Sequence, residues 1–248
     1  MRRIKLNFTV QVRADVAEDE DLLKLMKKAG IYVLCIGYES IYNKVLNKMH
    51  KGLTVEKLEK YTQILHNYGF YIHGMFILGY PGSELNKTIN EQADDYLKFI
   101  KKNKIDTIQV LKPVPLPGTE LRQRLEKEKR IYDLKLINWD KYDGNFVVFQ
   151  PDCDEKNLQD ATTKIMKNFY NPKSYLKLFA LPFISPIDLF YYTINKNYEL
   201  AKYVIKRKWR NTLIKIEGYK MIKNWLTKFK NENFYLKLSS AKSTLLSQ

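Results

Sequence analysis

The chain of 248 residues is poor in cysteine, with only Cys35 and Cys153. Two cysteines cannot build a disulfide framework or a four-ligand metal site, which excludes a disulfide-stapled secreted domain and a structural zinc domain. No apolar secretion signal is visible at the start, because Met1-Arg2-Arg3 is followed by the mixed segment Ile4-Lys5-Leu6-Asn7. We therefore expect a cytoplasmic protein, with peripheral contact to a membrane as the alternative.

Long hydrophobic runs are also missing. The most apolar stretch, Leu176–Ile194, contains Lys177, Asp188 and the prolines Pro182 and Pro186, so we do not expect it to span a membrane. Hydrophobic residues still make up 45% of the chain and charged residues 28%. This composition supports a folded core and argues against disorder.

Acidic residues are scarce in the last third of the chain. From Asn171 onward there are 15 Lys or Arg and four Asp or Glu, whereas the preceding residues hold 28 and 23. This basic tail fits a helical cover with a solvated face, a helix on an anionic membrane surface, or an RNA-binding module. We favour the solvated cover, then membrane contact, and do not favour nucleic acid. The basic residues concerned include Lys202, Lys206, Arg207, Lys208, Arg210 and Lys215.

Four segments rich in β-branched and apolar residues predict strands, each followed by a helical pattern. Such a succession predicts a parallel sheet with right-handed crossovers, either a barrel or a doubly wound sheet. A barrel wall is favoured, because no glycine-rich dinucleotide-binding turn follows the first strand. The predicted strands are Asn7–Arg13, Ile31–Ile36, Phe70–Leu78 and Thr107–Leu111.

The third predicted strand runs into the most informative segment of the chain, His73 to Glu84. An apolar run ends there in the loop Gly79-Tyr80-Pro81-Gly82, and an acidic residue then opens the next helical pattern. A buried parallel strand delivers its carboxyl end to a ligand site in this way, and glycine lets the backbone approach a ligand closely.

The pattern changes after the fourth strand. Prolines in Lys112–Glu120 exclude regular structure, and Thr119 can cap the helix that follows. A turn-rich segment, a short strand Phe146–Phe149 and an amphipathic helix Leu158–Tyr170 come next, and the remainder is helical. We therefore predict three parts: residues 1–130 as a partial barrel, 131–175 as an extension and 176–248 as the basic helical tail.

Several motifs in this order resemble the radical S-adenosylmethionine (SAM) superfamily, in the subgroup that usually carries a cobalamin-binding domain at its N-terminus. The resemblance covers about Phe8 to Tyr175. The motifs that carry it are Gln11-Val12-Arg13-Ala14-Asp15, Ile36-Gly37-Tyr38-Glu39-Ser40, His73-Gly74-Met75-Phe76 with Gly79-Tyr80-Pro81-Gly82, Pro113 to Leu121, and Trp139-Asp140-Lys141-Tyr142-Asp143-Gly144 with Val147-Val148-Phe149.

The resemblance implies an α/β fold with a partial parallel (β/α) barrel, of which this chain would hold the last four of six strand-helix units, plus an α-rich C-terminal extension. It also implies S-adenosylmethionine and a [4Fe-4S] cluster as cofactors, with cobalamin as a further candidate. In the family, three thiolates of a Cys-x3-Cys-x2-Cys loop after the first strand hold the cluster. This sequence contains no such triplet, so we do not expect the chain itself to bind the cluster.

The resemblance places cofactor contacts at the carboxyl ends of the four strands, where parallel barrels carry their functional side chains. It assigns no catalytic residue and no metal ligand in this chain. The implied contacts are Gln11 and Arg13 for the cofactor carboxylate or a polar group of the substrate, Glu39 and Ser40 for ribose or the amino group, Gly79 and Gly82 beside adenine and ribose, and the Val114 backbone bordering the adenine.

Plainer interpretations stand beside these roles. Arg13 could instead form a surface salt bridge with Asp15 or Glu18. Cys35, within an apolar strand, is typical of a small buried hydrophobe. No spacing joins the three histidines of the chain into a metal site.

The combined prediction is the C-terminal part of a radical SAM enzyme, with radical-initiated methylation or rearrangement of an unactivated carbon as the reaction of the complete protein. The substrate would be a small or lipid-like molecule, and an upstream domain or a partner chain would carry the cluster. The alternative is a non-catalytic remnant, or a binding subunit completed by a partner chain. An unpaired edge on the first strand would fit that alternative, because edge strands recruit partners.

Overall fold

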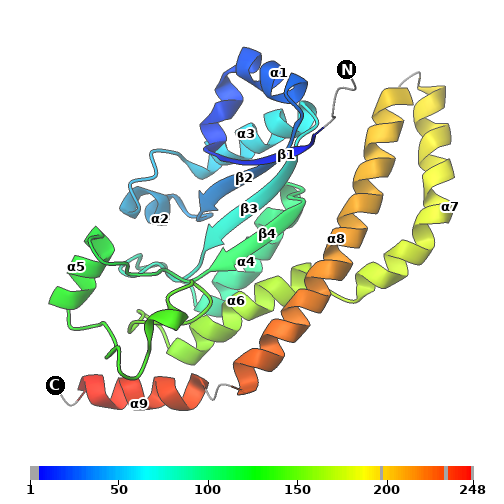
Figure 1. Cartoon of the computed structure of the whole chain (residues 1–248). Helices are drawn as coiled ribbons and strands as arrows, with labels where there is room; N and C mark the ends of the chain where they lie inside the picture. Colours follow the sequence, from blue (N-terminus) through cyan, green and yellow to red (C-terminus); the bar gives the residue numbers. More distant parts are fainter. Residues whose placement is uncertain (1–5, 196–197, 232–233, 247–248) are drawn as a thin grey trace.

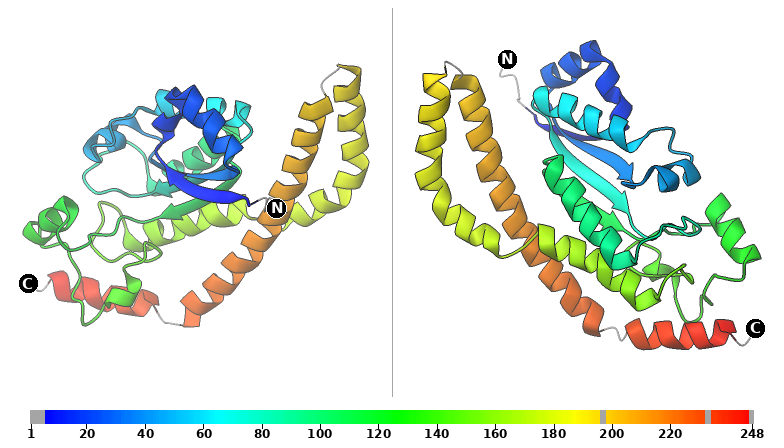
Figure 2. Two further views of the ribbon diagram at one scale, coloured as in Figure 1. Left: turned by 45° about the horizontal axis from the view of Figure 1, so that its top comes forward. Right: turned by 180° about the vertical axis from the view of Figure 1, so that it is seen from behind.

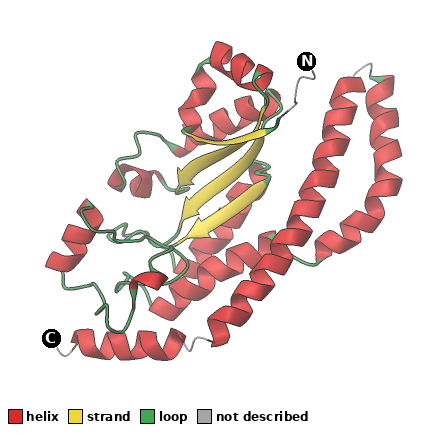
Figure 3. Cartoon of the chain, in the orientation of Figure 1, coloured by secondary structure: helices red, strands yellow, loops and turns green. Residues whose placement is uncertain are grey.

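The computed structural model describes residues 6–195, 198–231 and 234–246 of an α/β protein. Its centre is a parallel four-stranded sheet in the order β1-β2-β3-β4, with helices on one face and at the ends (Figures 1 and 3). All four predicted strands are confirmed. They are β1 (Phe8–Val12), β2 (Ile31–Glu39), β3 (Tyr71–Ile77) and β4 (Thr107–Leu111).

One face of the sheet is covered by helices that connect the strands, as the view from behind in Figure 2 shows. Alternate strand residues such as Leu34, Ile36 and Phe76 are fully or almost fully buried there. They belong to one core with apolar side chains of α1, α3 and α4. The helices before β4 are η1 (Ala14–Glu18), α1 (Glu20–Lys28), α2 (Asn43–Lys48), α3 (Val55–Asn67) and α4 (Ile89–Lys102).

Side chains of the expected type cap these helices. The hydroxyl of Thr54 accepts a hydrogen bond from the Lys57 amide at the start of α3, and Thr119 does the same for Arg122 at the start of α5 (Glu120–Lys127). Each satisfies an amide that has no partner within its helix. The predicted N-cap Thr119 is therefore confirmed.

The extension closes one edge of the sheet. Helix α6 (Glu155–Phe169) packs on α4 and β4. At its end the Tyr170 hydroxyl donates to the carbonyl oxygen of Ile108 and accepts from the Ile108 amide, each at 2.9 Å. Since Ile108 lies in the edge strand β4, this one side chain occupies backbone groups that another strand would use.

A long helical hairpin follows. Helices α7 (Lys173–Ile194) and α8 (Tyr198–Asn231) pack side by side, α7 lies on the far side of α8 from the sheet, and α9 (Phe234–Leu246) ends the described chain (Figures 1 and 2). None of the described helices is long and apolar enough to cross a membrane.

Helix α8 is anchored across the amino ends of the strands. Asp106, just before β4 and 1% exposed, pairs with Arg207 at 2.7 Å. The Arg210 guanidinium lies 4.4 Å from the ring centres of both Tyr32 and Tyr71. The expectation of a merely solvated basic face is therefore wrong for these two arginines.

Two further differences concern local structure. The predicted strand Phe146–Phe149 is irregular, with only an isolated bridge between Ile131 and Phe149. Its backbone is instead bound by side chains, for example the Gln159 amide oxygen that accepts from the Val147 amide at 3.1 Å. Strand β2 continues past the predicted end at Ile36 to Glu39, through an irregularity in the register.

Candidate functional site: the open face of the sheet

The second face of the sheet is not covered by the helices that connect the strands, and it carries polar side chains. Register partners in a sheet point to the same side, and Gln11, Cys35, His73 and Thr107 are paired in one row across the four strands. Gln11 is exposed and the other three are partly exposed. Parallel sheets normally bury both faces, so an open polar face indicates a surface that lines a site or receives another part of a protein.

Within this row, His73 and Thr107 form a hydrogen bond of 2.9 Å between the His73 Nδ1 atom and the Thr107 hydroxyl. Burial lowers the pKa of His73, because desolvation disfavours the imidazolium. The imidazole is therefore neutral at pH 7 and can donate or accept a proton in a hydrogen bond. His73 was expected only as part of a motif, and the register shows that it faces the open side.

Glu39 lies at the carboxyl end of β2 in a conformation that non-glycine residues seldom adopt, with φ of 59°. A register irregularity between Gly37 and Glu39 turns its side chain back over the strand. A Cβ at Gly37 would lie 2.3 Å from the Glu39 Oε1 atom, so the carboxylate occupies the space above Gly37. The Lys51 ammonium, at 3.1 Å, holds it there.

This strain has a physical meaning. A left-handed non-glycine residue costs about 1–3 kcal/mol and persists where the surroundings fix it, frequently at functional sites. The ion pair with Lys51 is largely shielded, since the two side chains are 27% and 15% exposed. The ion pair and the backbone conformation therefore fix the position of the Glu39 carboxylate.

Ser40 diverges from Glu39 although the two are neighbours in the chain. It is fully buried, its Oγ atom accepts from the Tyr42 amide at 3.2 Å, and the Tyr96 hydroxyl lies 3.2 Å from it. Tyr96 also donates to the Ile77 carbonyl at 2.9 Å. The Ser40 hydroxyl therefore joins β2, β3 and α4 within the core and lies apart from the open face.

Arg13 is exposed just after β1, where its guanidinium donates to Asp15 at 2.9 and 3.0 Å. Hydrogen bonding to Asp15 raises the pKa of Arg13 and lowers the pKa of Asp15. The alternative of a surface salt bridge with Asp15 is therefore confirmed. A ligand at this position would meet an arginine whose charge is already partly neutralised.

The Gly79–Gly82 loop is fixed by contacts from several elements. Gly79 has φ of 80°, and a Cβ there would lie 2.5 Å from a methyl group of Leu158. The Lys48 ammonium donates to the Gly82 carbonyl at 2.8 Å, and the Gly82 amide donates to Asp152. The loop lines a cavity of about 440 Å³ together with residues of α4 and the Asp152 region.

The segment after β4 contains a buried lysine that sequence reasoning did not single out. Lys112 is 2% exposed, and its ammonium donates to the Asn145 carbonyl at 2.9 Å. Burial lowers the pKa of Lys112 to about 7, while Asp143 and Asp160 oppose the shift. The sequence signal that could have identified Lys112 as a candidate site residue is its position directly before Pro113 and Val114. The Val114 carbonyl itself accepts from the Leu116 amide at 3.0 Å.

The predicted contacts therefore form separate groups. Gln11 and Glu39 lie toward the open face, Gly79 and Gly82 line the loop cavity, and Ser40 is in the core. Their roles toward a cofactor stay predictions.

The cysteines do not fit an iron–sulfur cluster. Cys35 lies on β2 and Cys153 lies in the extension just before α6, and burial raises the pKa of Cys35 and raises that of Cys153 to about 11. Cluster ligands are thiolates, which both environments disfavour. Among the described residues there is also no group of three His, Cys, Asp or Glu side chains arranged to hold a metal ion.

Comparison with known proteins identifies the relatives. Residues 119–184 match the family described as "Domain of unknown function (DUF4070)". The bacteriochlorophyllide d C-12(1)-methyltransferase of Chlorobaculum tepidum is 24% identical over 71% of this chain and 37% of its own length. An uncharacterized methyltransferase of Pyrococcus horikoshii is 25% identical over 85% and 40%. The anaerobic magnesium-protoporphyrin IX monomethyl ester cyclase of Rubrivivax gelatinosus is 25% identical over 66% and 28%. The chain thus spans less than half the length of each of these three relatives.

Two solved structures show weaker similarity. The Elp3 protein of Methanocaldococcus infernus, lacking its N-terminus, has a TM-score of 0.47 at 21% identity and covers 64% of this chain and 33% of its own. A cobalamin-dependent S-adenosylmethionine radical enzyme with aqua-cobalamin bound has a TM-score of 0.42 at 15% identity and covers 99% and 47%. At these scores neither supports a conclusion about this chain.

The fold is that of an α/β protein built on a parallel sheet, with polar side chains on the face that the connecting helices leave open. The chain resembles the radical S-adenosylmethionine superfamily, in the subgroup associated with cobalamin-binding domains, and its similarity to these methyltransferases and the cyclase supports that resemblance.

Proposed function

We propose that this chain supplies part of the cavity wall of a radical SAM enzyme, and that the cluster-binding segment comes from residues outside this sequence. The reaction of the complete enzyme would be a methylation or rearrangement of an unactivated carbon in a small or lipid-like substrate. The names of the curated relatives, which are methyltransferases and a cyclase, support this class of reaction.

The open polar face of the sheet carries the proposal. Parallel sheets are normally covered on both faces. In this four-stranded sheet Gln11, His73 and Thr107 lie on a face without such a cover, so a further part of the protein would cover it. In the proposed enzyme the four strands are the last four of a six-stranded partial barrel, and this face is the inner wall. S-adenosylmethionine, the cluster and, where it is used, cobalamin would be held with the missing part.

The two sheet edges differ in a way that supports the same proposal. The β4 edge is closed by Tyr170 and α6, whereas no described strand pairs with the outer edge of β1. Phe8 at the start of β1 is 45% exposed. An unpaired edge strand readily pairs with another strand. The missing strands of the barrel would add at β1.

In such an assembly this chain binds and orients, and it does not generate the radical. The Glu39 carboxylate, fixed by Lys51 and the strained backbone, would accept hydrogen bonds from hydroxyl or amino groups of a ligand. The neutral His73 would offer a further polar contact on the inner face. We retain the division into a partial barrel, an extension and a helical tail as part of the proposal.

A non-catalytic role is the second candidate. The lack of a Cys-x3-Cys-x2-Cys segment and the unsuitable environments of Cys35 and Cys153 favour it. In that case the chain is a remnant, or a subunit that binds a ligand or a partner chain without taking part in radical formation.

Two measurements separate the two candidates. The first reads the coding DNA before Met1 in all three frames, and the second determines the mass of the native protein in a blot with an antibody to this chain. The enzyme proposal expects a cysteine-triplet segment continuous with this chain, or a separate cysteine-bearing chain that co-purifies with it. A native protein of 29.5 kDa without such a partner would leave only the non-catalytic candidate.

A further inference from the structure

Helix α7 exposes a continuous apolar face. Six large apolar side chains recur on it at intervals of three or four residues, which places them on one side of the helix. Each is between 64% and 77% exposed. They are Leu176, Phe179, Phe183, Ile187, Phe190 and Ile194, which we call the α7 stripe.

The opposite side of α7 is the side that packs on α8. Leu181 is buried there, Ser185 accepts from the Trp209 indole at 3.0 Å, and Asp188 pairs with Lys208 at 2.6 Å. Because α7 is the outer helix of the hairpin in every view, the α7 stripe points away from the protein body (Figures 1 and 2). A contiguous apolar surface of this extent marks an interaction site.

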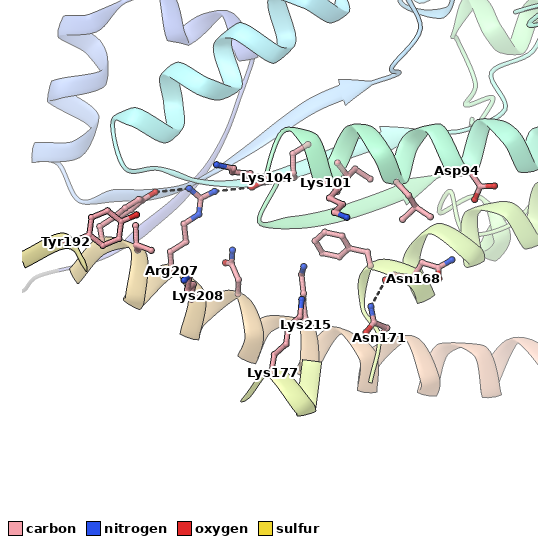
Figure 4. Close-up of a pocket in the computed structure, with 17 residues that line it drawn as sticks. Asp94, Lys101, Lys104, Asn168, Asn171, Lys177, Tyr192, Arg207, Lys208 and Lys215 are labelled. Carbon is pink, nitrogen blue, oxygen red and sulfur yellow. Dashed lines mark hydrogen bonds between the residues drawn. The ribbon is translucent and has the colours of Figure 1, made fainter. Parts of the chain in front are cut away.

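Positive charge without an acidic partner accompanies this helix. A cavity of about 860 Å³ lies between α4, α7 and α8 and is lined by five lysines and Arg207 (Figure 4). Arg207 is neutralised by Asp106 and Lys208 by Asp188. The four other lysines form no ion pair with a described carboxylate. They are Lys101, Lys104, Lys177 and Lys215.

The cavity holds like charges at close range. Burial and the neighbouring Lys177 charge lower the pKa of Lys215, whose ammonium lies 4.2 Å from the centre of the Phe169 ring. The only carboxylate among the described lining residues, Asp94, is paired with Lys164 at 2.7 Å. An anion near Lys177 and Lys215 would relieve this repulsion.

We propose that α7 docks in the plane of an anionic lipid bilayer, with the α7 stripe in the boundary of the acyl chains and the exposed lysines of its own first turns, Lys173 and Lys177, beside lipid phosphates. A bilayer surface is apolar beneath and anionic above, which matches an apolar helix face with Lys173 and Lys177 in its first turns. The prolines Pro182 and Pro186 and the charges within α7 fit a helix that lies on a membrane and does not cross it.

This contact differs from the one expected from composition, which placed it in the basic tail as a whole. Arg207 and Arg210 of α8 are engaged with the protein body. The docking element is therefore α7, and the lysines of its first turns add the preference for anionic lipid.

The test is co-sedimentation of the full chain with vesicles of phosphatidylcholine alone or mixed equally with phosphatidylglycerol. The variant is Phe179→Ser with Phe183→Ser and Phe190→Ser, which changes only side chains that are at least 69% exposed. Its matched control is Leu22→Ser with Leu25→Ser on α1, where both leucines are also exposed. A Phe183→Trp variant reports on the surroundings of the helix through its fluorescence.

We expect the unchanged chain to bind the anionic vesicles. The α7 variant should weaken this binding more than about tenfold, because each apolar side chain buried in the bilayer contributes to the partition free energy. The α1 control should leave the binding unchanged. The Phe183→Trp emission should shift to shorter wavelength when anionic vesicles are added. Equal binding to both kinds of vesicle, binding unaffected by the α7 variant, or no binding would overturn the proposal. So would a dimer in solution that the α7 variant dissociates, because the stripe would then be an interface between copies.

Discussion

Replacing Arg207 by methionine tests how the helical hairpin is attached to the sheet. The Asp106 carboxylate, 1% exposed, accepts from the Ile72 amide at 3.0 Å and from Asn211 at 2.7 Å. Arg207 adds the only guanidinium, with Nε at 2.7 Å and Nη2 at 3.0 Å. The partners Asp106 and Arg207 are 101 residues apart in the chain, so the pair fixes α8 to the amino end of β4.

Arg207→Met would leave a buried carboxylate with neutral donors only. Removing one partner of a buried ion pair costs about 3–5 kcal/mol, because the remaining charge is neither paired nor hydrated. The arginine side chain is only 16% exposed, so solvent screening reduces this cost little. The equilibrium for release of α8 from the sheet should therefore rise by roughly a hundredfold or more.

Urea unfolding and amide hydrogen exchange over residues 198–223 would measure this change. The matched control is Lys208→Met, one residue along α8, whose pair with Asp188 is more exposed and should cost less than about 1 kcal/mol. An Arg207→Met variant within about 1 kcal/mol of the unchanged protein, with unaltered exchange in α8, would refute this explanation of how α8 is attached.

Three further substitutions test local features. Burial lowers the pKa of Lys112 in the folded protein from 10.5 to about 7, so between these pH values the folded state binds fewer protons than the unfolded state. The free energy of unfolding should therefore rise with pH across this window by up to a few kcal/mol. In urea titrations at several pH values, Lys112→Met should abolish this rise. Gly37→Ala should displace the Glu39 carboxylate and cost about 1–3 kcal/mol, but much less in a Glu39→Ala background; equal costs in the two backgrounds would contradict the contact. Tyr170→Phe should cost about 1–3 kcal/mol by thermal unfolding, because both backbone groups of Ile108 lose their partner, and a neutral effect would count against the closed β4 edge.

The sheet could be predicted because its signals are local. Alternating and apolar runs identified all four strands, and Thr119 marked the start of α5. The attachment of α8 could not be predicted in this way. Nothing local distinguishes Arg207, which meets Asp106, from Lys208, which lies on the other side of the same helix turn and meets Asp188.

The sequence predicted the candidate contacts at the carboxyl ends of the strands, but it could not predict that these residues would lie in separate groups. Glu39 and Ser40 are consecutive in the chain. The register irregularity in β2 directs the Glu39 side chain over Gly37 and the Ser40 side chain into the core. Such an irregularity depends on the pairing of β2 with β3. The burial of Lys112 likewise depends on the loop around Asn145, which lies more than thirty residues further along the chain.

The most direct test is to measure cluster content and 5′-deoxyadenosine after anaerobic reconstitution with iron, sulfide and S-adenosylmethionine. The purified chain is compared with the native protein captured by an antibody to it. We predict that the chain alone forms no [4Fe-4S] cluster and no 5′-deoxyadenosine, whereas the native protein, with a cysteine-bearing segment or partner, forms both. Cluster formation and cofactor cleavage by the isolated 248-residue chain would contradict the central claim that it supplies only part of the cavity wall.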